Sequence, residues 1–582
     1  MSDSYFAIRG YHEDSVASRR NADEEILGGD GKPSFIGSFH KTLPHNEYGE
    51  VEPADFIQLR DALSAPPADA ARLVDAVPSG VADSAGFASP LAGRANERLL
   101  PQATSVEMGP APGVLHASTA AELVELYWMA LLRDLPFASF GQNALVAEAI
   151  QDLQTAFGAA LDSDVNQDLG KLQLLEDLPE KAGQLDLTLQ TLFRCGLPGE
   201  DKGPIVSQFF LHGVRYGTQY IDQRVQPFKA GEDYMQTYAE WLLVQRKAKD
   251  SDGKKYSQSW PNLEPTVRPF LTMRDLVTFV NKDALHQAYF NAALSLLSSG
   301  YPWNPGQPYE APNNSPRQDG FASYGGPHLL TLVSEVASRA LKIVWHQKWQ
   351  VHRRQRPEAY AGRLHMELVG PPGMPRRNYG LSTVVKDSEA LRRIQAMQGG
   401  AAFLPMPVRS GSPTHPAYGA GHATVAGACV TVLKAWFDGR APIKDPVSLV
   451  DLPTYAAIPV DGSDPFRAHY KPLPPLADGH GMTVEGELNK LACNVAMGRS
   501  MAGVHYRSDN TRSLRLGETL AIVFLVREMR DFMDRKIGGI RAPFLEFNTF
   551  DRQTIRLTAD GVFVNGSATL DPYFQRFLDK PC

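Results

Sequence analysis

The sequence predicts a mainly α-helical protein with a large helical core, an extended N-terminal arm and a small C-terminal β-hairpin. Three observations carry this prediction. Apolar residues recur at helical spacing through most of the 582-residue chain, the first 118 residues are punctuated by proline and glycine, and the tail alternates between apolar and polar residues. Apolar residues make up 43% of the chain and charged residues 21%, so a core large enough to enclose a site can form.

Residues 1–118 are predicted to form the extended arm. Helical periodicity is weak there, and the stretch from Ala65 to Gly113 contains many prolines and glycines. Apolar residues such as Leu73, Leu99 and Leu100 make this stretch too apolar to remain free in solution. We therefore expect it to contact a neighbouring subunit of a homo-oligomer.

Residues 119–540 are predicted to form the helical core. The periodic pattern begins at Ala120, where apolar residues return every three or four positions. Similar patterns predict helices over 185–196, 231–248, 273–298 and 327–354.

Three later helices follow in the same core. One is predicted from Gly421 to Asp438, with Gly439 as its C-terminal stop. The others are predicted over 484–502 and 515–535. In the tail, 541–582, a run of alternating residues followed by Asp-Gly and a second apolar run predicts a β-hairpin.

Charge and hydropathy exclude several classes of function. The 58 Lys and Arg residues are outnumbered by 65 Asp and Glu residues, which argues against nucleic acid or an anionic membrane surface as a partner. No run approaches the ~20 apolar residues of a membrane span, and no signal peptide is visible. We expect a soluble protein, either cytoplasmic or exported by an unrecognised route. The four cysteines are far apart, so no disulfide framework or metal site is predicted.

A basic segment stands out in this acidic protein. Between Lys342 and Arg377 there are eight Lys or Arg residues against two Glu. Lys348 and Arg356 are eight residues apart on one predicted helix that Pro357 ends, so they share a face and form a cationic pocket. The remaining arginines are expected on a solvated helix face; they are Arg353, Arg354, Arg376 and Arg377.

Two further segments complement these cations. The Gly419-Ala420-Gly421 turn leads into a helix whose first N–H groups can bind an anion, and His415 and His422 lie beside it. Arg499 and His505 are six residues apart, which is about 240° on a continuous helix. They converge only if the helix ends near Gly503.

The same segment supplies a carboxylate. Asp509, four residues after His505, can bind the second imidazole nitrogen and set its tautomer. These groups together describe a pocket for a tetrahedral oxyanion.

The segments KWQVHRRQRPEA (348–359), SPTHPAYGAGHAT (412–424), GRSMAGVHYRSD (498–509) and LPHNEYGEV (43–51) resemble the vanadium-dependent haloperoxidases. The similarity is strongest to the algal bromoperoxidase type, which shares an ancestral architecture with the type 2 phosphatidic acid phosphatases. It covers most of the chain and implies a core of two four-helix bundles.

The resemblance implies an orthovanadate cofactor, V(V), and no haem. His505 would bind the vanadium, and His422 would take a proton from hydrogen peroxide as the acid/base group. Lys348 would also polarise the bound peroxide. The implied cofactor-binding residues are Lys348, Arg356, Gly421, His422, Arg499 and His505.

Three other residues acquire roles through the resemblance. Trp345 and His415 occupy the positions that flank the halide, and the histidine favours bromide over chloride. Asp283 is similar to the carboxylate that pairs with the acid/base histidine. The implied reaction is the oxidation of bromide or iodide by hydrogen peroxide to a hypohalous acid equivalent, which halogenates an organic acceptor. A homo-oligomer, a dimer or a larger assembly such as a dodecamer, is also implied.

The chain departs from the family pattern beside this pocket. Ala420 replaces the usual Ser, Gly419 replaces the usual Pro, and Gly498 stands where the phosphatase-like signature has Ser. Loss of a hydroxyl donor predicts weaker vanadate binding. Two alternatives stay open: an acid phosphatase with His505 as nucleophile, and a non-catalytic protein that binds anions or supports assembly.

Overall fold

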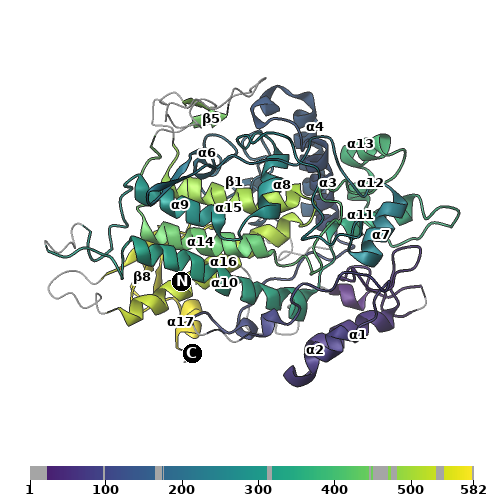
Figure 1. The fold of residues 1–582 in the computed structure, drawn as a ribbon, viewed down its shortest axis with the longest axis horizontal. Helices are drawn as coiled ribbons and strands as arrows, with labels where there is room; N and C mark the ends of the chain where they lie inside the picture. Colours follow the sequence, from purple (N-terminus) through teal and green to yellow (C-terminus); the bar gives the residue numbers. More distant parts are fainter. Residues whose placement is uncertain are drawn as a thin grey trace.

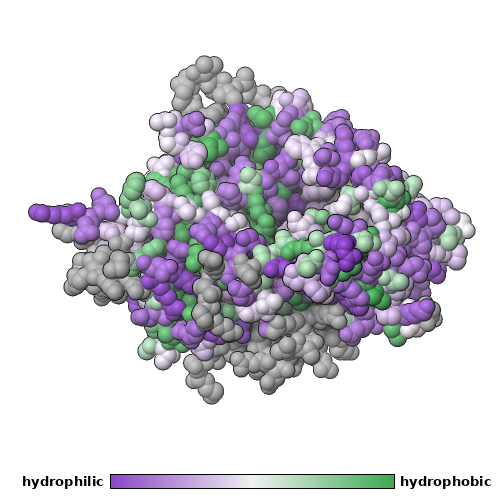
Figure 2. Space-filling model, turned by 60° about the horizontal axis from the view of Figure 1, so that its bottom comes forward, coloured by the Kyte–Doolittle hydropathy of each residue, from purple (hydrophilic) through white to green (hydrophobic). Residues whose placement is uncertain are grey.

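Helices dominate the computed structural model, and its sheets are small, so the prediction of a mainly α protein is confirmed (Figure 1). The structure describes residues 22–29, 31–95, 97, 99–163, 174, 176–310, 317–444, 447–449, 470–472, 481–532 and 543–579. Over these ranges, no helix is long and apolar enough to cross a membrane. The face in Figure 2 carries mostly hydrophilic side chains, with apolar side chains in small groups between them.

Helix α14 (Gly421–Trp436) lies in the centre of the core. It packs against α10 (Gly326–His346), α15 (Val484–Met501) and α16 (Arg507–Asp531), as the green, teal and yellow ribbons in Figure 1 show. Nearly every residue of α14 is buried, as expected for a helix that is apolar on all sides.

Two glycines permit the close packing of α14 against α16. A Cβ on Gly427 would collide with the carbonyl of Leu514, and one on Gly517 would collide with that of Thr424. The two backbones can therefore approach each other without side chains between them. This contact holds the N-terminus of α14 near the N-terminus of α16, where the candidate site lies.

A second group of helices packs beside this core. Helix α3 (Ala117–Leu131) contacts α4 (Ala144–Leu161), α12 (Thr383–Lys386) and α13 (Glu389–Met397). Helix α8 (Met273–Lys282) packs on α15, and α9 (Gln287–Ser298) packs on α10. The other helices are α1 (Pro53–Ser64), α2 (Pro67–Asp75), α6 (Gln208–Leu211), α7 (Tyr238–Lys247), α11 (Pro357–Leu368) and α17 (Pro572–Leu578).

The strands form short antiparallel pairs and one three-stranded sheet. The pairs are β1 (Glu180–Lys181) with β2 (Gln184–Leu185), β3 (Val214–Tyr216) with β4 (Gln219–Ile221), and β5 (Val447–Leu449) with β6 (Tyr470–Pro472). The predicted C-terminal hairpin is confirmed as β8 (Thr554–Leu557) and β9 (Val562–Val564), and β7 (Leu545–Asn548) extends it to three strands. The ammonium of Lys434 joins this sheet to the core, because it donates to the Asn548 carbonyl and pairs with Glu518.

The N-terminal part differs from the extended arm that we expected. Helices α1 and α2 interrupt it, and each begins with a proline, which suits the first turn of a helix because its missing N–H has no intrahelical acceptor there. Leu100, Val106 and Met108 are buried in the hydrophobic core of the same chain. Leu100 thus packs within its own subunit, whereas Leu73 and Leu99 are only half-buried.

Several predicted helix limits were wrong. Residues 185–196 are not helical but comprise the end of β2 and an irregular stretch with turns, and the helix predicted over 273–298 divides at Asp283 into α8 and α9. The last core helix starts at Arg507 rather than 515. Cys195, Cys429 and Cys493 are buried free thiols, as expected, and Cys582 lies outside the described residues.

Candidate active site

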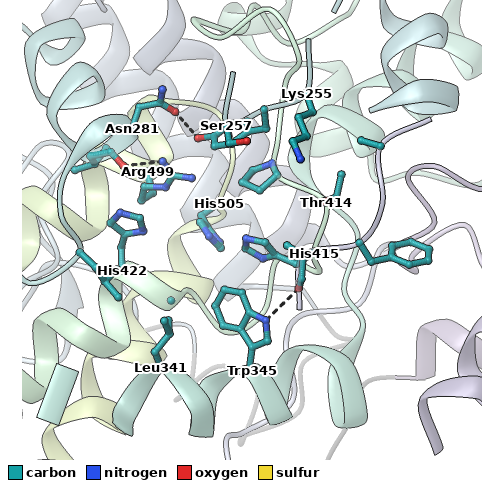
Figure 3. Close-up of a pocket in the computed structure, with 18 of the residues that line it drawn as sticks. Lys255, Ser257, Asn281, Leu341, Trp345, Thr414, His415, His422, Arg499 and His505 are labelled. Carbon is teal, nitrogen blue, oxygen red and sulfur yellow. Dashed lines mark hydrogen bonds between the residues drawn. The ribbon is translucent and has the colours of Figure 1, made fainter. Parts of the chain in front are cut away.

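A cavity of about 440 Å³ opens where the end of α8, the end of α10, the start of α14, the end of α15 and the turn before α16 meet. Residues 85–88, 255–257 and 413–415 complete its lining. Asp283, Trp345, His415, His422 and His505 line it. Figure 3 shows the three imidazoles around the same space, with His505 between the other two. Gly421 and Arg499 also line the cavity, so residues separated by more than 200 positions meet there.

Lys348 and Arg356 lie next to residues that line this cavity, Lys348 by Trp345 and Arg356 by His505, but not on one helix as predicted. The chain leaves α10 through a π-helical turn, Gln347–His352, and Arg353 then adopts a left-handed conformation with φ of 46°. Arg356 is extended because proline restricts the residue before it, and Pro357 begins α11 instead of ending a helix. The extended segment returns Arg356 to the site, although the helical reasoning that predicted its position was wrong.

The turn between α15 and α16 places His505. Gly503 has φ of 71° and ends α15, as predicted, so that His505 can point toward the same cavity as Arg499. Asp509, in the first turn of α16, accepts hydrogen bonds from His505 Nδ1 and the Tyr506 N–H, both at 3.0 Å. Because Nδ1 carries the proton in this pairing, Nε2 keeps its lone pair.

A buried arginine holds Asp509 in turn. Arg354 donates to the carboxylate of Asp509 at 2.8 Å and to that of Glu122 at 3.1 Å. These two carboxylates raise the pKa of Arg354, despite its complete burial. The expectation of a solvated Arg354 was therefore wrong, since Glu122 and Asp509 come from helices distant in sequence. Arg353 is also buried and pairs with Glu24.

Three cations surround His505, and among the described residues none of them has a carboxylate within ion-pair distance. Lys348 donates to the carbonyls of Pro416 and Ala417. Arg499 donates to the Val280 carbonyl at 2.9 Å, and its Nε has no hydrogen-bond partner. Other buried arginine Nε atoms of the described residues, such as those of Arg194 and Arg363, also lack a partner, so the absence of carboxylates near all three cations is the stronger indication of an anion site.

Arg356 connects the cations with two histidines. Its guanidinium lies 3.1 Å from His505 Nε2 and 2.9 Å from His415 Nδ1, and it also donates to the His415 carbonyl. Burial and Arg499 lower the pKa of Arg356 to about 10. Burial and Arg356 lower the pKa of Lys348 well below its ordinary value. Cations that repel one another in this way are stabilised by an anion between them.

The two remaining histidines have different surroundings. His422, at the second position of α14, lies 3.0 Å through Nε2 from the carboxylate of Asp283. Asp283 follows the last residue of α8 and is not helical, and its side chain is nearly buried. His415 stacks at a tilt on Trp345, with 4.8 Å between ring centroids, and burial and Lys348 lower its pKa well below the ordinary value.

The unusual turn before α14 fits its surroundings. A Cβ on Gly419 would lie 2.6 Å from Ser513 Oγ, so this position accepts no larger residue without movement. The Ala420 N–H donates to the same hydroxyl at 2.8 Å, and the Ala420 side chain is buried. Gly498 faces Val280 of α8 in a helix contact. The three departures from the family pattern are thus accommodated by packing.

Another buried ion pair supports the loop that carries His415, and no sequence pattern indicated it. Lys41 Nζ lies 2.6 Å from Glu358 and donates to the carbonyls of Ser410 and Ser412. Glu358 also accepts the Ser412 N–H. The pair therefore ties α11 and the N-terminal arm to the loop before His415.

Replacing Lys41 with methionine is expected to lower the free energy of unfolding by about 3–5 kcal/mol, because it leaves the buried Glu358 charge uncompensated. Urea unfolding followed by circular dichroism measures this. Lys181→Met, at an exposed position of β1, is the control and should change stability by less than about 0.5 kcal/mol. Equal stability of the two variants would contradict a supporting role for Lys41.

The fold and the site define a helical protein with a cluster of buried cations around His505. The family model for the VCPO second helical-bundle domain matches residues 328–533. The chain is 34% identical to a vanadium-dependent bromoperoxidase of Corallina pilulifera, over 90% of this chain and 91% of that protein. It is 30% identical to one from Ascophyllum nodosum, over 95% of this chain and 93% of that protein.

A solved structure agrees with these relatives. The second vanadate-dependent bromoperoxidase of Ascophyllum nodosum, a homohexamer, superimposes with a TM-score of 0.80 and 29% identity, covering 94% of this chain and 88% of that one. The chain belongs to the family of vanadium-dependent bromoperoxidases.

Proposed function

We propose that the protein is a vanadate-dependent haloperoxidase that oxidises bromide, and also iodide, with hydrogen peroxide. The observation that carries the proposal is the set of three buried cations around His505 that have no carboxylate partner in the part of the chain that the structure describes. Vanadate fits this set, because it is a tetrahedral anion that needs several charged donors and a neutral imidazole nitrogen suits its metal. The names of the bromoperoxidase relatives support oxidation rather than phosphate ester hydrolysis.

Each residue of the site acquires a role in this proposal. Vanadate, when bound, supplies Lewis acidity. His505 binds the metal through Nε2, since Asp509 holds the other nitrogen. Lys348, Arg356 and Arg499, with the backbone of Gly421, hold the oxyanion.

His422 and Asp283 transfer the proton that hydrogen peroxide loses. With its Nε2–H donated to Asp283, His422 has Nδ1 available to accept a proton from hydrogen peroxide. Trp345 and His415 border the halide, and the polar imidazole beside the indole favours bromide over chloride. A phosphatase would use the same His505 as nucleophile, so the cations alone do not separate the two reactions.

We also propose how the chain is divided into domains and that it forms a homo-oligomer. Helices α10, α14, α15 and α16 form one bundle, which the matched range 328–533 supports, and α3 and α4 belong to another. Helices α12 and α13 lie within the matched range but pack on α3. The chain divides into an arm over 1–118, a core over 119–540 and a tail over 541–582. The homohexamer of the Ascophyllum protein supports a homo-oligomer for this chain.

Bromination of a phenol dye tests the function. Activity should require both bromide and hydrogen peroxide and should rise when orthovanadate is added, because the hydroxyl missing at Ala420 costs about 1–3 kcal/mol, or roughly 5- to 150-fold in vanadate dissociation constant. Metal analysis should find vanadium in the active protein. Hydrolysis of a phosphate monoester without bromination at saturating orthovanadate would favour the phosphatase.

A further inference from the structure

The cavity is larger than the oxyanion and its peroxide require. At ~30 Å³ for each water displaced, an anion with five heavy atoms occupies roughly 150 Å³. The cavity measures about 440 Å³. The remaining space, roughly 300 Å³, is near the lower limit for sites that bind small organic molecules.

Part of the wall of this space is apolar. Phe87, Leu285, Leu341 and Trp345 line it. The Trp345 N–H donates to the Ala88 carbonyl at 3.2 Å, and Phe87 packs edge-on against Trp349 at 5.6 Å between centroids. The two aromatic rings are therefore held in place, which suits a flat apolar ligand.

The opposite side carries a cation. In Figure 3, Lys255 lies across the cavity from Leu341 and Trp345, and its amine points toward the space between them. Lys255 is exposed, and no carboxylate in the described ranges pairs with it. Its neighbour Tyr256 is fixed by a hydrogen bond to Asn281, and Ser257 adds a hydroxyl. An anionic group at the mouth of the cavity would complement this lysine.

We propose that the cavity binds the organic acceptor, and that the acceptor is an electron-rich aromatic acid whose carboxylate faces Lys255 while its ring lies on the apolar side. The inference rests on the proposed haloperoxidase function. Peroxide, bromide and one proton give hypobromous acid and water. A ring carbon then forms a bond to bromine as the O–Br bond breaks, and the ring proton leaves with hydroxide as water.

The test compares 4-hydroxybenzoate with phenol, which is neutral at pH 7. Both acceptors compete in one reaction with bromide, hydrogen peroxide and saturating orthovanadate, and the ratio of brominated products is compared with that from reagent hypobromous acid. The enzyme should favour 4-hydroxybenzoate by about 3- to 5-fold over the reagent, as expected for one partly exposed ion pair. Lys255→Ala should return the ratio to that of the reagent. Lys254→Ala, at the adjacent exposed lysine that does not line the cavity, should leave it unchanged.

A binding measurement separates this inference from the function. Calorimetric titration of the orthovanadate-loaded protein with 4-hydroxybenzoate, without peroxide, should give a dissociation constant that rises about 3- to 5-fold in Lys255→Ala and stays constant in Lys254→Ala. Product ratios equal to those of the reagent in all three proteins, or no binding, would overturn the inference. Absence of bromination of both acceptors would contradict the proposed function, while the titration would still decide whether Lys255 binds the anion.

Discussion

His505→Ala is expected to abolish vanadium binding and bromination while the helical fold persists. The substitution removes the imidazole whose Nδ1 pairs with Asp509 and whose Nε2, 3.1 Å from Arg356, is the proposed vanadium ligand. Vanadate affinity should fall by at least about 1000-fold, since that factor corresponds to only ~4 kcal/mol. The measurement is vanadium per subunit after gel filtration in orthovanadate, with circular dichroism to verify the fold.

A second histidine supplies the control for this experiment. His286→Ala removes an imidazole at the start of α9, which does not line the cavity, and should retain both vanadium and activity. Vanadium at unchanged stoichiometry in His505→Ala would show that the oxyanion is held without a protein–metal bond. Loss of vanadium in both variants would point to a general effect on folding.

Asp509→Asn is expected to weaken vanadate binding by about 10- to 100-fold, the usual cost of changing the group that orients a metal-binding histidine. The carboxylate of Asp509 accepts from His505 and from Arg354, so an amide cannot satisfy both contacts. Because Arg354 also loses part of its charge compensation, the free energy of unfolding should fall by about 3–5 kcal/mol. Orthovanadate titration of activity and urea unfolding measure the two effects.

Glu122→Gln is the matched variant, since it removes the other carboxylate of Arg354 without touching His505. It should destabilise the protein comparably and change vanadate affinity by less than about 3-fold. If both variants weakened vanadate binding equally, Asp509 would act through the stability of the core and not through His505.

Much of the site could be predicted from short segments of sequence. Gly503 as the end of α15 and Asp509 as the partner of His505 follow from local rules, because a left-handed glycine ends a helix and a residue four positions on can reach the imidazole. The start of α14 at Gly421 is equally local. Predictions of this kind depend on a few neighbouring residues and do not depend on how the segment packs against the rest of the fold.

Other features depended on partners distant in sequence. The basic segment predicts that Arg354 and Arg376 are both solvent-exposed. Arg376 is exposed, but Arg354 is buried, because Glu122 and Asp509 compensate its charge. The left-handed Arg353 interrupts the helix that the spacing of Lys348 and Arg356 predicted. The pattern of one segment cannot predict that a carboxylate from another helix will pair with its arginine.

The sequence by itself determined the helical class, because this follows from local periodicity. It also determined the three segments that meet at the site and the residue types that bind a tetrahedral anion, because these follow from the chemistry of side chains. Only the tertiary structure decided which cations lack carboxylate partners, how the N-terminal arm packs on its own subunit and which lysine faces the cavity. Burial and ion pairing are properties of groups brought together from distant segments, and a charged residue has the same sequence pattern whether water or a buried carboxylate surrounds it.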